Sequence, residues 1–384
     1  MAIAALTLGF AGVLASHPAA AYLIENLVSD LPGVAAHQDP NLVNPWGLTR
    51  SATSPWWVAD NGAGVSTLYD GSGARRPLVV TIPPAAGGSP PSAPTGVVSN
   101  PNAGSFGGAR FIFSSEDGVI ASWQNVPPGN TNAVRQVDNS AAGSVYKGLA
   151  IGSSGGQDVV YATDFHNNRV DAFSFDASTN RFVTASLSGK FTDPNLPAGY
   201  APFGIQNIGG QLYVTYALKE PGGNDDVPGP GHGFVDVFDT NGNLLRRFAS
   251  DDKLNSPWGL ALAPGDFGEF SKDLLIGNFG DGTINAFDPV TGAFLGQLKD
   301  ANGDPLRIDG LWALQFGSGD PASASGKPNQ LFFTAGIPGP DGEVEDHGLF
   351  GLIAVPEPSS AAMLLAGLAA LGLRGRRRRP GAVA

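Results

Sequence analysis

The side chains best suited to chemistry in this chain of 384 residues lie in polar segments between short apolar runs. The longest segments place histidine beside carboxylates or amides, and they are residues 164–168, 220–233 and 336–348. Carboxylate and amide oxygens are the ligands that Ca²⁺ prefers, whereas a histidine–carboxylate set suits a transition metal. A histidine beside a carboxylate can also act as a general acid and base.

Ten residues from these segments, and from shorter ones of the same kind, form our candidate face for a ligand or metal. They are Asp60, Asn61, Asp164, His166, Asn168, Asp225, Asp226, His232, Asn278 and His347. No spacing among them matches a calcium loop or a zinc motif, so Ca²⁺ or another divalent cation is indicated by ligand type alone. A metal site and a metal-free binding surface both stay open.

Motifs for covalent catalysis are weak. Residues 152–156, Gly-Ser-Ser-Gly-Gly, fit the nucleophile-elbow pattern, but no helix follows, so we interpret them as a turn. There is no phosphate loop or dinucleotide fingerprint, and the absence of cysteine excludes disulfides and a thiol nucleophile.

The charge distribution limits the partners. The formal net charge is −12, and the residues after Pro356 contribute five Arg and one Glu, so the rest of the chain carries about −16. Nucleic acids and anionic membranes need a cationic surface, which argues against both as partners of the body. A composition of 54 Gly, 31 Pro and 15% charged residues indicates a turn-rich globular chain.

The polar segments recur because the chain repeats. Pro-Trp-Gly-Leu occurs at residues 45–48 and 257–260, and weaker copies bring the total to six. The repeats are anchored by glycines 47, 96, 148, 204, 259 and 310. A period near fifty residues, with four strand-sized apolar runs separated by turn residues, is typical of a propeller blade.

We therefore predict an all-β fold, a six-bladed β-propeller over residues 22–354. The anchoring glycine should open the innermost strand, where strands crowd the channel, and Trp46, Trp258 and Trp312 should pack between blades. The sixth copy lacks a fourth strand, while an unpaired apolar run precedes the first copy. Pairing of residues 22–28 with residues 349–353 would close the ring.

Propeller topology sorts the loops. Connections from second to third strands, and from blade to blade, emerge on one face. This places the candidate residues, with Glu116, Glu345 and His37, on a single face. Long loops on a rigid scaffold usually carry function.

Both termini have the composition of targeting segments. Residues 1–21 match a secretory signal peptide, with Ala19 and Ala21 at a small-x-small cleavage site, although no Lys or Arg precedes the apolar run. Residues 355–384 begin with Val355, Pro356, Glu357 and Pro358 and continue with the apolar run 361–373 and an arginine cluster. The run is shorter than the roughly twenty residues of a comfortable membrane span, and the arginines fix that end in the cytoplasm. A simple C-terminal anchor is the other interpretation.

This C-terminal segment resembles the PEP-CTERM sorting signal of Gram-negative surface proteins. The resemblance implies a short transmembrane helix that tethers the protein to the membrane until an exosortase removes it, commonly in bacteria that make exopolysaccharide. It therefore implies export to the cell surface or extracellular matrix, with exopolysaccharide or a surface protein as the expected partner.

The body, from the run Asp39–Gly47 and the run Val58–Asn61 onward, resembles a family of secreted bacterial propellers related in architecture to NHL-type propellers. That resemblance implies the fold and leaves the chemistry open. The leading functional hypothesis is a binding or interaction module. The alternative is a metal-dependent hydrolase or lyase that uses Asp164, His166, Asp225, Asp226 and His347 at the channel mouth.

Overall fold

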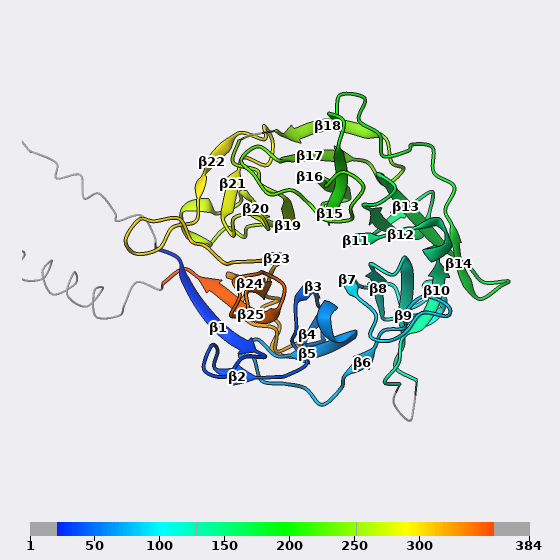
Figure 1. Cartoon of the computed structure of the whole chain (residues 1–384), viewed down its shortest axis with the longest axis horizontal. Coiled ribbons are helices and arrows are strands. Elements are labelled where there is room, and N and C mark those ends of the chain that lie inside the picture. The colour runs from blue at the N-terminus through cyan, green and yellow to red at the C-terminus, as the bar shows by residue number, and fades with distance from the viewer. Residues whose placement is uncertain (1–20, 127–129, 251, 357–384) are drawn as a thin grey trace, which may run out of the picture.

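Six sheets surround one axis in the computed structural model, which describes residues 21–126, 130–250 and 252–356 (Figure 1). Five sheets have four strands each, and the sixth has five. In the first five blades the chain enters at the innermost strand and moves outward through antiparallel neighbours. This confirms the predicted six-bladed all-β propeller.

The first five blades are built from consecutive strands. Blade one comprises β3 (Pro45–Thr49), β4 (Trp56–Asp60), β5 (Val65–Tyr69) and β6 (Val80–Thr81), and blade two comprises β7 (Pro94–Ser99), β8 (Phe111–Ser115), β9 (Val119–Trp123) and β10 (Val134–Asp138). Blade three comprises β11 (Tyr146–Ser154), β12 (Gln157–Asp164), β13 (Arg169–Asp176) and β14 (Arg181–Thr184). Blade four comprises β15 (Tyr200–Ile208), β16 (Gln211–Leu218), β17 (Gly233–Phe238) and β18 (Leu244–Ala249), and blade five comprises β19 (Pro257–Leu262), β20 (Leu274–Asn278), β21 (Ile284–Phe287) and β22 (Phe294–Gln297).

Blade six combines the two ends of the described chain. Its inner strands are β23 (Leu311–Phe316), β24 (Gln330–Ile337) and β25 (His347–Ala354), and outside them lie β1 (Leu23–Ser29) and the short β2 (His37–Gln38). Strand β1 pairs antiparallel with β25, with Ile24 opposite Ile353 and Ser29 opposite Leu349. The N-terminal segment thus occupies the position of a fourth strand.

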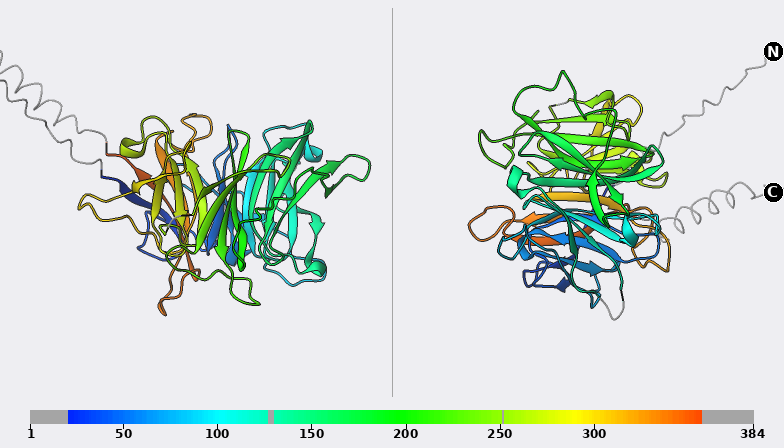
Figure 2. Two further views of the ribbon diagram at one scale, coloured as in Figure 1. Left: turned by 90° about the horizontal axis from the view of Figure 1, so that it is seen from above. Right: turned by 90° about the vertical axis from the view of Figure 1, so that its right-hand side faces the viewer.

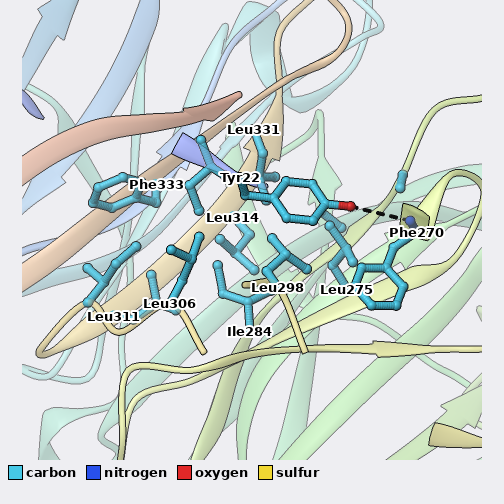
Figure 3. Packing of buried hydrophobic residues seen from close by; sticks show 14 of the residues in the cluster. Tyr22, Phe270, Leu275, Ile284, Leu298, Leu306, Leu311, Leu314, Leu331 and Phe333 are labelled. Atoms are coloured by element: carbon cyan, nitrogen blue, oxygen red, sulfur yellow. Dashed lines mark hydrogen bonds between the residues drawn. The ribbon is translucent and has the colours of Figure 1, made fainter. Parts of the chain in front are cut away.

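The residue before β1 is part of the core between blades five and six. The Tyr22 ring packs among side chains such as Leu275, Leu314 and Leu331 (Figure 3). Its hydroxyl donates to the Phe267 carbonyl oxygen at 3.0 Å and accepts the Phe270 N–H at 3.3 Å. Burial of this ring adds apolar contact to the strand pairing.

Close approach of neighbouring inner strands explains the anchoring glycines. A Cβ atom on Gly47 would meet the Thr95 carbonyl and lie 2.7 Å from the Val97 nitrogen. The sixth anchor was predicted incorrectly: Leu311 pairs with Ala335 and Leu314 with Phe333, so Ala313 takes the glycine position. Gly310 lies before that strand, where its φ of +64° favours glycine.

The side views show strands running between two faces, each formed by loops (Figure 2). No helix within the described residues is long and apolar enough to cross a membrane. Residues 1–20 of the expected signal peptide, with Ala19, fall outside those residues, as does the sorting segment from Glu357 and Pro358 onward. Val355 is described, and it packs against the core between blades five and six.

Candidate functional site

The loops that join second to third strands share one face, as predicted, which we call the loop face. Asn61 Nδ2 donates to Glu116 Oε2 at 3.0 Å, between blades one and two. His166 Nδ1 lies 2.7 Å from Asn224 Oδ1, between blades three and four. Each bond joins loops of the same class from neighbouring blades.

Three of the candidate residues are structural. Asp60, Asp164 and Asn278 each end a second strand and are completely buried. Asp60 Oδ2 accepts the Thr67 N–H and hydroxyl at 3.0 and 2.8 Å, and Asp164 Oδ1 accepts the Val145 N–H at 3.1 Å. Asn278 donates to the Lys253 carbonyl at 2.7 Å. These fully buried side chains hold the blade turns, whereas the sequence pattern placed them on the candidate face for a ligand or metal.

The histidines do not converge. His232 Nδ1 lies 2.8 Å from the Val227 carbonyl in its own loop, and His347 Nδ1 lies 2.6 Å from Asp30 Oδ2, just after β1. His166 is exposed and bonds to Asn224, as above, and His37 is exposed on the outer strand β2. The topology places these residues on one face but spreads them over blades three, four and six. His37 and His347, both in blade six, lie on different strands of that sheet.

The remaining candidates have separate environments. Asn168 Oδ1 accepts a hydrogen bond from Lys219 Nζ at 2.8 Å. Asp226 is half-buried, its Oδ2 has no hydrogen-bond partner in the part of the chain that the structure describes, and burial raises its pKa. Asp225 is exposed, yet its Oδ1 lies 3.5 Å from Lys147 Nζ. Asn61, which contacts Glu116, and Asp225, which lies near Lys147, are therefore the candidates at the mouth of the channel.

Residues 21–126, 130–250 and 252–356 contain no group of three His, Asp or Glu side chains placed to hold one metal ion. The histidines and carboxylates proposed as ligands for Ca²⁺ or another divalent cation therefore do not form such a group within those ranges. The five residues of the metal-dependent hydrolase or lyase hypothesis are instead divided among structural bonds, separate loops and the channel mouth.

Strand register places one residue from each inner strand at the same level of the channel. In blade one Pro45 pairs with Asp60 and Leu48 with Val58, so the register shifts between these two pairs. The other inner strands have a register shift at the equivalent place. The residue that follows the last pair before this shift therefore lies at the same level in all six strands. The six residues at this level are Trp46, Thr95, Lys147, Phe203, Trp258 and Trp312. Lys147 is the only charged one among them.

Aromatic rings fill the axis at this level. Trp46 stacks on Trp312 with ring centroids 3.5 Å apart, and Trp258 meets both edge-on at 6.4 and 5.7 Å. All three are buried, so the expected packing role is confirmed, but they meet near the axis across blades one, five and six. These rings form an apolar floor beneath the loop face.

Lys147 extends over this floor. Its side chain is 3% exposed, and Nζ lies 5.0 Å from the Trp46 ring centroid, a cation–π contact. Nζ also lies 2.5 Å from Glu116 Oε1 and 3.5 Å from Asp225 Oδ1. A lysine from blade three is thereby bound to loops of blades two and four.

A third carboxylate comes from blade six. Glu345 Oε1 accepts a hydrogen bond from Asn44 Nδ2 at 3.3 Å, and Asn44 Oδ1 accepts the Trp312 indole N–H at 3.2 Å. Glu345 has a φ of +76°, a backbone conformation that costs free energy for a non-glycine residue. We call the following residues the mouth cluster: Asn44, Asn61, Glu116, Lys147, Asp225 and Glu345.

The electrostatics of the mouth cluster are coupled. Burial raises the pKa of Glu345 to about 7, with Lys147 acting against the shift and Glu116 adding to it. Burial would lower the pKa of Lys147, but Glu116, Asp225 and Glu345 together raise it. The mouth thus holds one lysine cation and three carboxyl groups, one of which titrates near neutral pH.

Sequence reasoning did not select Lys147, Asn44, Glu116 or Glu345 as site residues. Glu116 and Glu345 were placed on the correct face but were not separated from other loop acids. Lys147 lies in a weak repeat copy, at the position that Trp46 holds in blade one. A charged residue at an otherwise apolar or uncharged repeat position was the available signal.

The C-terminal segment carries a known sorting signal. Residues 354–379 match the PEP-CTERM protein-sorting motif, a signal that implies processing by an exosortase. The motif marks the chain as an exported, surface-sorted protein.

Solved structures with the same architecture define the class as a propeller. Streptogramin B lyase has a TM-score of 0.50 at 14% identity, and the match covers 89% of this chain and all of that one. The luciferin-regenerating enzyme has a TM-score of 0.50 at 13% identity, covering 87% and 95%. At such identities the likeness concerns the fold alone.

Relatives with higher sequence identity show the family of the chain. One uncharacterised protein of Acanthamoeba polyphaga mimivirus is 34% identical over 329 residues, covering 82% of this chain and 76% of the relative. A second from the same virus is 34% identical over 304 residues, covering 77% and 79%. The chain belongs to the same family as these uncharacterised proteins.

Proposed function

We propose that this exported propeller binds a ligand rich in hydrogen-bond donors, such as a glycan, at the mouth cluster. The observation that supports the proposal is the convergence of Glu116, Asp225 and Glu345, from three different blades, around Lys147. The cluster lies above an aromatic floor on the loop face, where the Asp225 side chain is exposed to solvent.

A purely structural role accounts for only part of this arrangement. One buried lysine needs one carboxylate, which Glu116 provides. A partly buried carboxyl such as Glu345, held among other acids on a backbone of positive φ, costs stability. Perturbed groups of this kind are concentrated at functional sites.

The chemistry of the cluster favours donors over anions. Glu116, Asp225 and Glu345 can accept further hydrogen bonds, because a carboxylate offers about four lone-pair sites. Sugar hydroxyls would satisfy these acceptors, whereas phosphates or sulfates would meet like charge. A surface protein that presents Lys or Ser side chains would make the same bonds.

A glycan array probed with the mature protein tests the proposal. We expect binding to a subset of neutral glycans, lost in Glu345→Gln and Glu116→Gln and retained in Glu343→Gln, an exposed acid of the same loop. Retained glycan binding by the Glu345→Gln and Glu116→Gln proteins would place the site elsewhere. Absence of glycan binding would leave a surface protein as the ligand, to be tested with the same three variants.

A second candidate function is acid–base catalysis by a hydrolase or lyase. The observation that favours it is Glu345, whose pKa of about 7 allows proton exchange at neutral pH beside the Lys147 cation. In this form the activity needs no metal. Turnover of a bound glycan that persists in the presence of a chelator and disappears in Glu345→Gln would support catalysis. Binding without turnover would support the binding module.

A further inference from the structure

A second pocket lies between blades three and four, apart from the mouth cluster. Its volume is about 470 Å³, within the roughly 300–1,000 Å³ typical of small-molecule sites. The walls come from the start of β13, from the segment between β14 and β15, and from β15 and β16. None of its lining residues belongs to the mouth cluster.

One wall of the pocket is aromatic. Phe191, Tyr200 and Tyr216 line it, and Phe191 and Tyr216 are held rigidly because they are more than nine-tenths buried. The Tyr216 hydroxyl is buried, and it has no hydrogen-bond partner among residues 21–126, 130–250 and 252–356. An aromatic wall of this kind suits the face of a ring-shaped ligand.

The acceptors at the pocket are already occupied. Asp193 Oδ1 accepts the Asn195 N–H at 2.8 Å, and Asp193 Oδ2 pairs with Arg247. The network continues from Arg247 to the buried Asp236. Both oxygens of the Asp193 carboxylate therefore already have partners within the protein.

The donors at the pocket, in contrast, have spare capacity. Lys190 is exposed, and its ammonium forms no hydrogen bond or ion pair with any described residue. Arg169 binds Asp171 and Asp164 through Nε and Nη2, which leaves Nη1 without a partner among the described residues. Asn168 uses its oxygen on Lys219, so its amide N–H group is similarly available.

We propose that this pocket binds a small carboxylate attached to a ring. The carboxylate would take up the donors of Lys190, Arg169 and Asn168, and the ring would lie on the Phe191 and Tyr200 side. Charge-assisted hydrogen bonds make such recognition specific even on a protein of negative net charge. Aromatic acids and sugar acids share this chemistry.

Ligand-observed NMR titration of the purified protein with benzoate and D-glucuronate tests the proposal and distinguishes the two sources. We expect at least one of them to bind at least about tenfold more tightly than its neutral counterpart, benzamide or D-glucose. This difference in affinity corresponds to one charge-assisted hydrogen bond. Lys190→Gln should weaken binding by a similar factor, while Lys299→Gln, another exposed lysine, should not.

Three results would each overturn the proposal. They are the absence of saturable binding of either acid, equal binding of the neutral counterparts, and unchanged affinity in Lys190→Gln. Because Lys190 and Lys299 are both exposed, loss of folding is not expected in either variant.

Discussion

Lys147 Nζ lies 2.5 Å from Glu116 Oε1 although the two residues come from different blades and the lysine is 97% shielded from solvent. The contact joins an inner-strand residue of blade three to a loop of blade two. A buried ammonium that is paired in this way depends on its carboxylate partner, because an uncompensated charge in the interior is strongly unfavourable.

Removing the charge of Lys147 should therefore destabilise the propeller. We expect Lys147→Met to lower the free energy of unfolding by about 3 kcal/mol, since Glu116 and Glu345 would remain close together without their cation. Urea denaturation followed by fluorescence measures this. The double variant Lys147→Met/Glu116→Gln should recover part of the loss, and a single variant as stable as the wild type would show that the pair contributes little.

The pairing of β1 with β25 leads to a prediction about truncation. A protein that begins at Asp39 lacks β1 and Tyr22, so it exposes the outer edge of blade six and part of the core between blades five and six. We expect this truncation to abolish the cooperative thermal transition, which calorimetry would record. Removal of residues 1–21 serves as the control and should leave the transition intact. A full transition in the shorter protein would show that closure by β1 is dispensable.

The sorting motif leads to a prediction about the mature protein. We expect export to remove residues 1–21 and exosortase processing to remove the segment that begins near Val355. Intact-mass analysis of the protein from its native envelope would then show neither the signal peptide nor the arginine cluster. Recovery of the arginine cluster on the mature protein would instead indicate a simple membrane anchor.

The repeat made the fold predictable from sequence, but the site only in part. Glycine at a fixed place in each inner strand identifies the blade, since neighbouring backbones exclude a Cβ there. Ala313 at the sixth position shows the limit of this rule, because a nearby glycine, Gly310, gave a misleading anchor. Only the strand pairing shows that Ala313, and not Gly310, occupies the position of the anchoring glycine.

The lack of spatial information in the sequence also explains which candidate residues were misplaced. Loop topology correctly assigned Asn61, Asp225 and Glu345 to one face, but it carries no information on distance from the axis. His347 was therefore selected as a candidate and Glu345 was not, although the partner of His347 is Asp30, just after β1. Asp60 was selected as a ligand candidate, but its carboxylate is buried and accepts a hydrogen bond from its own turn.

The raised pKa of Glu345 predicts a pH dependence of stability. A carboxyl whose pKa is higher in the folded state stabilises the fold below its unfolded value, near 4.5, and loses that contribution as the pH rises through about 7. Relative to Glu345→Gln, the wild type should therefore become less stable between pH 5 and pH 7.5 and change little above that. Urea titrations at several pH values measure the difference, with Glu343→Gln as control. A pH-independent difference would contradict the prediction.

The measurement that tests the mouth cluster most directly is the carbon-13 chemical shift of the Glu345 carboxyl as a function of pH, assigned by comparison with Glu345→Gln. If this carboxyl is held above the aromatic floor beside Lys147 and Glu116, its midpoint should lie near pH 7. Loss of the favourable Lys147 charge in Lys147→Met should raise the midpoint further. A midpoint near 4.5 that does not respond to Lys147→Met would mean that Glu345 is solvated and apart from the cluster, which would contradict the proposed site.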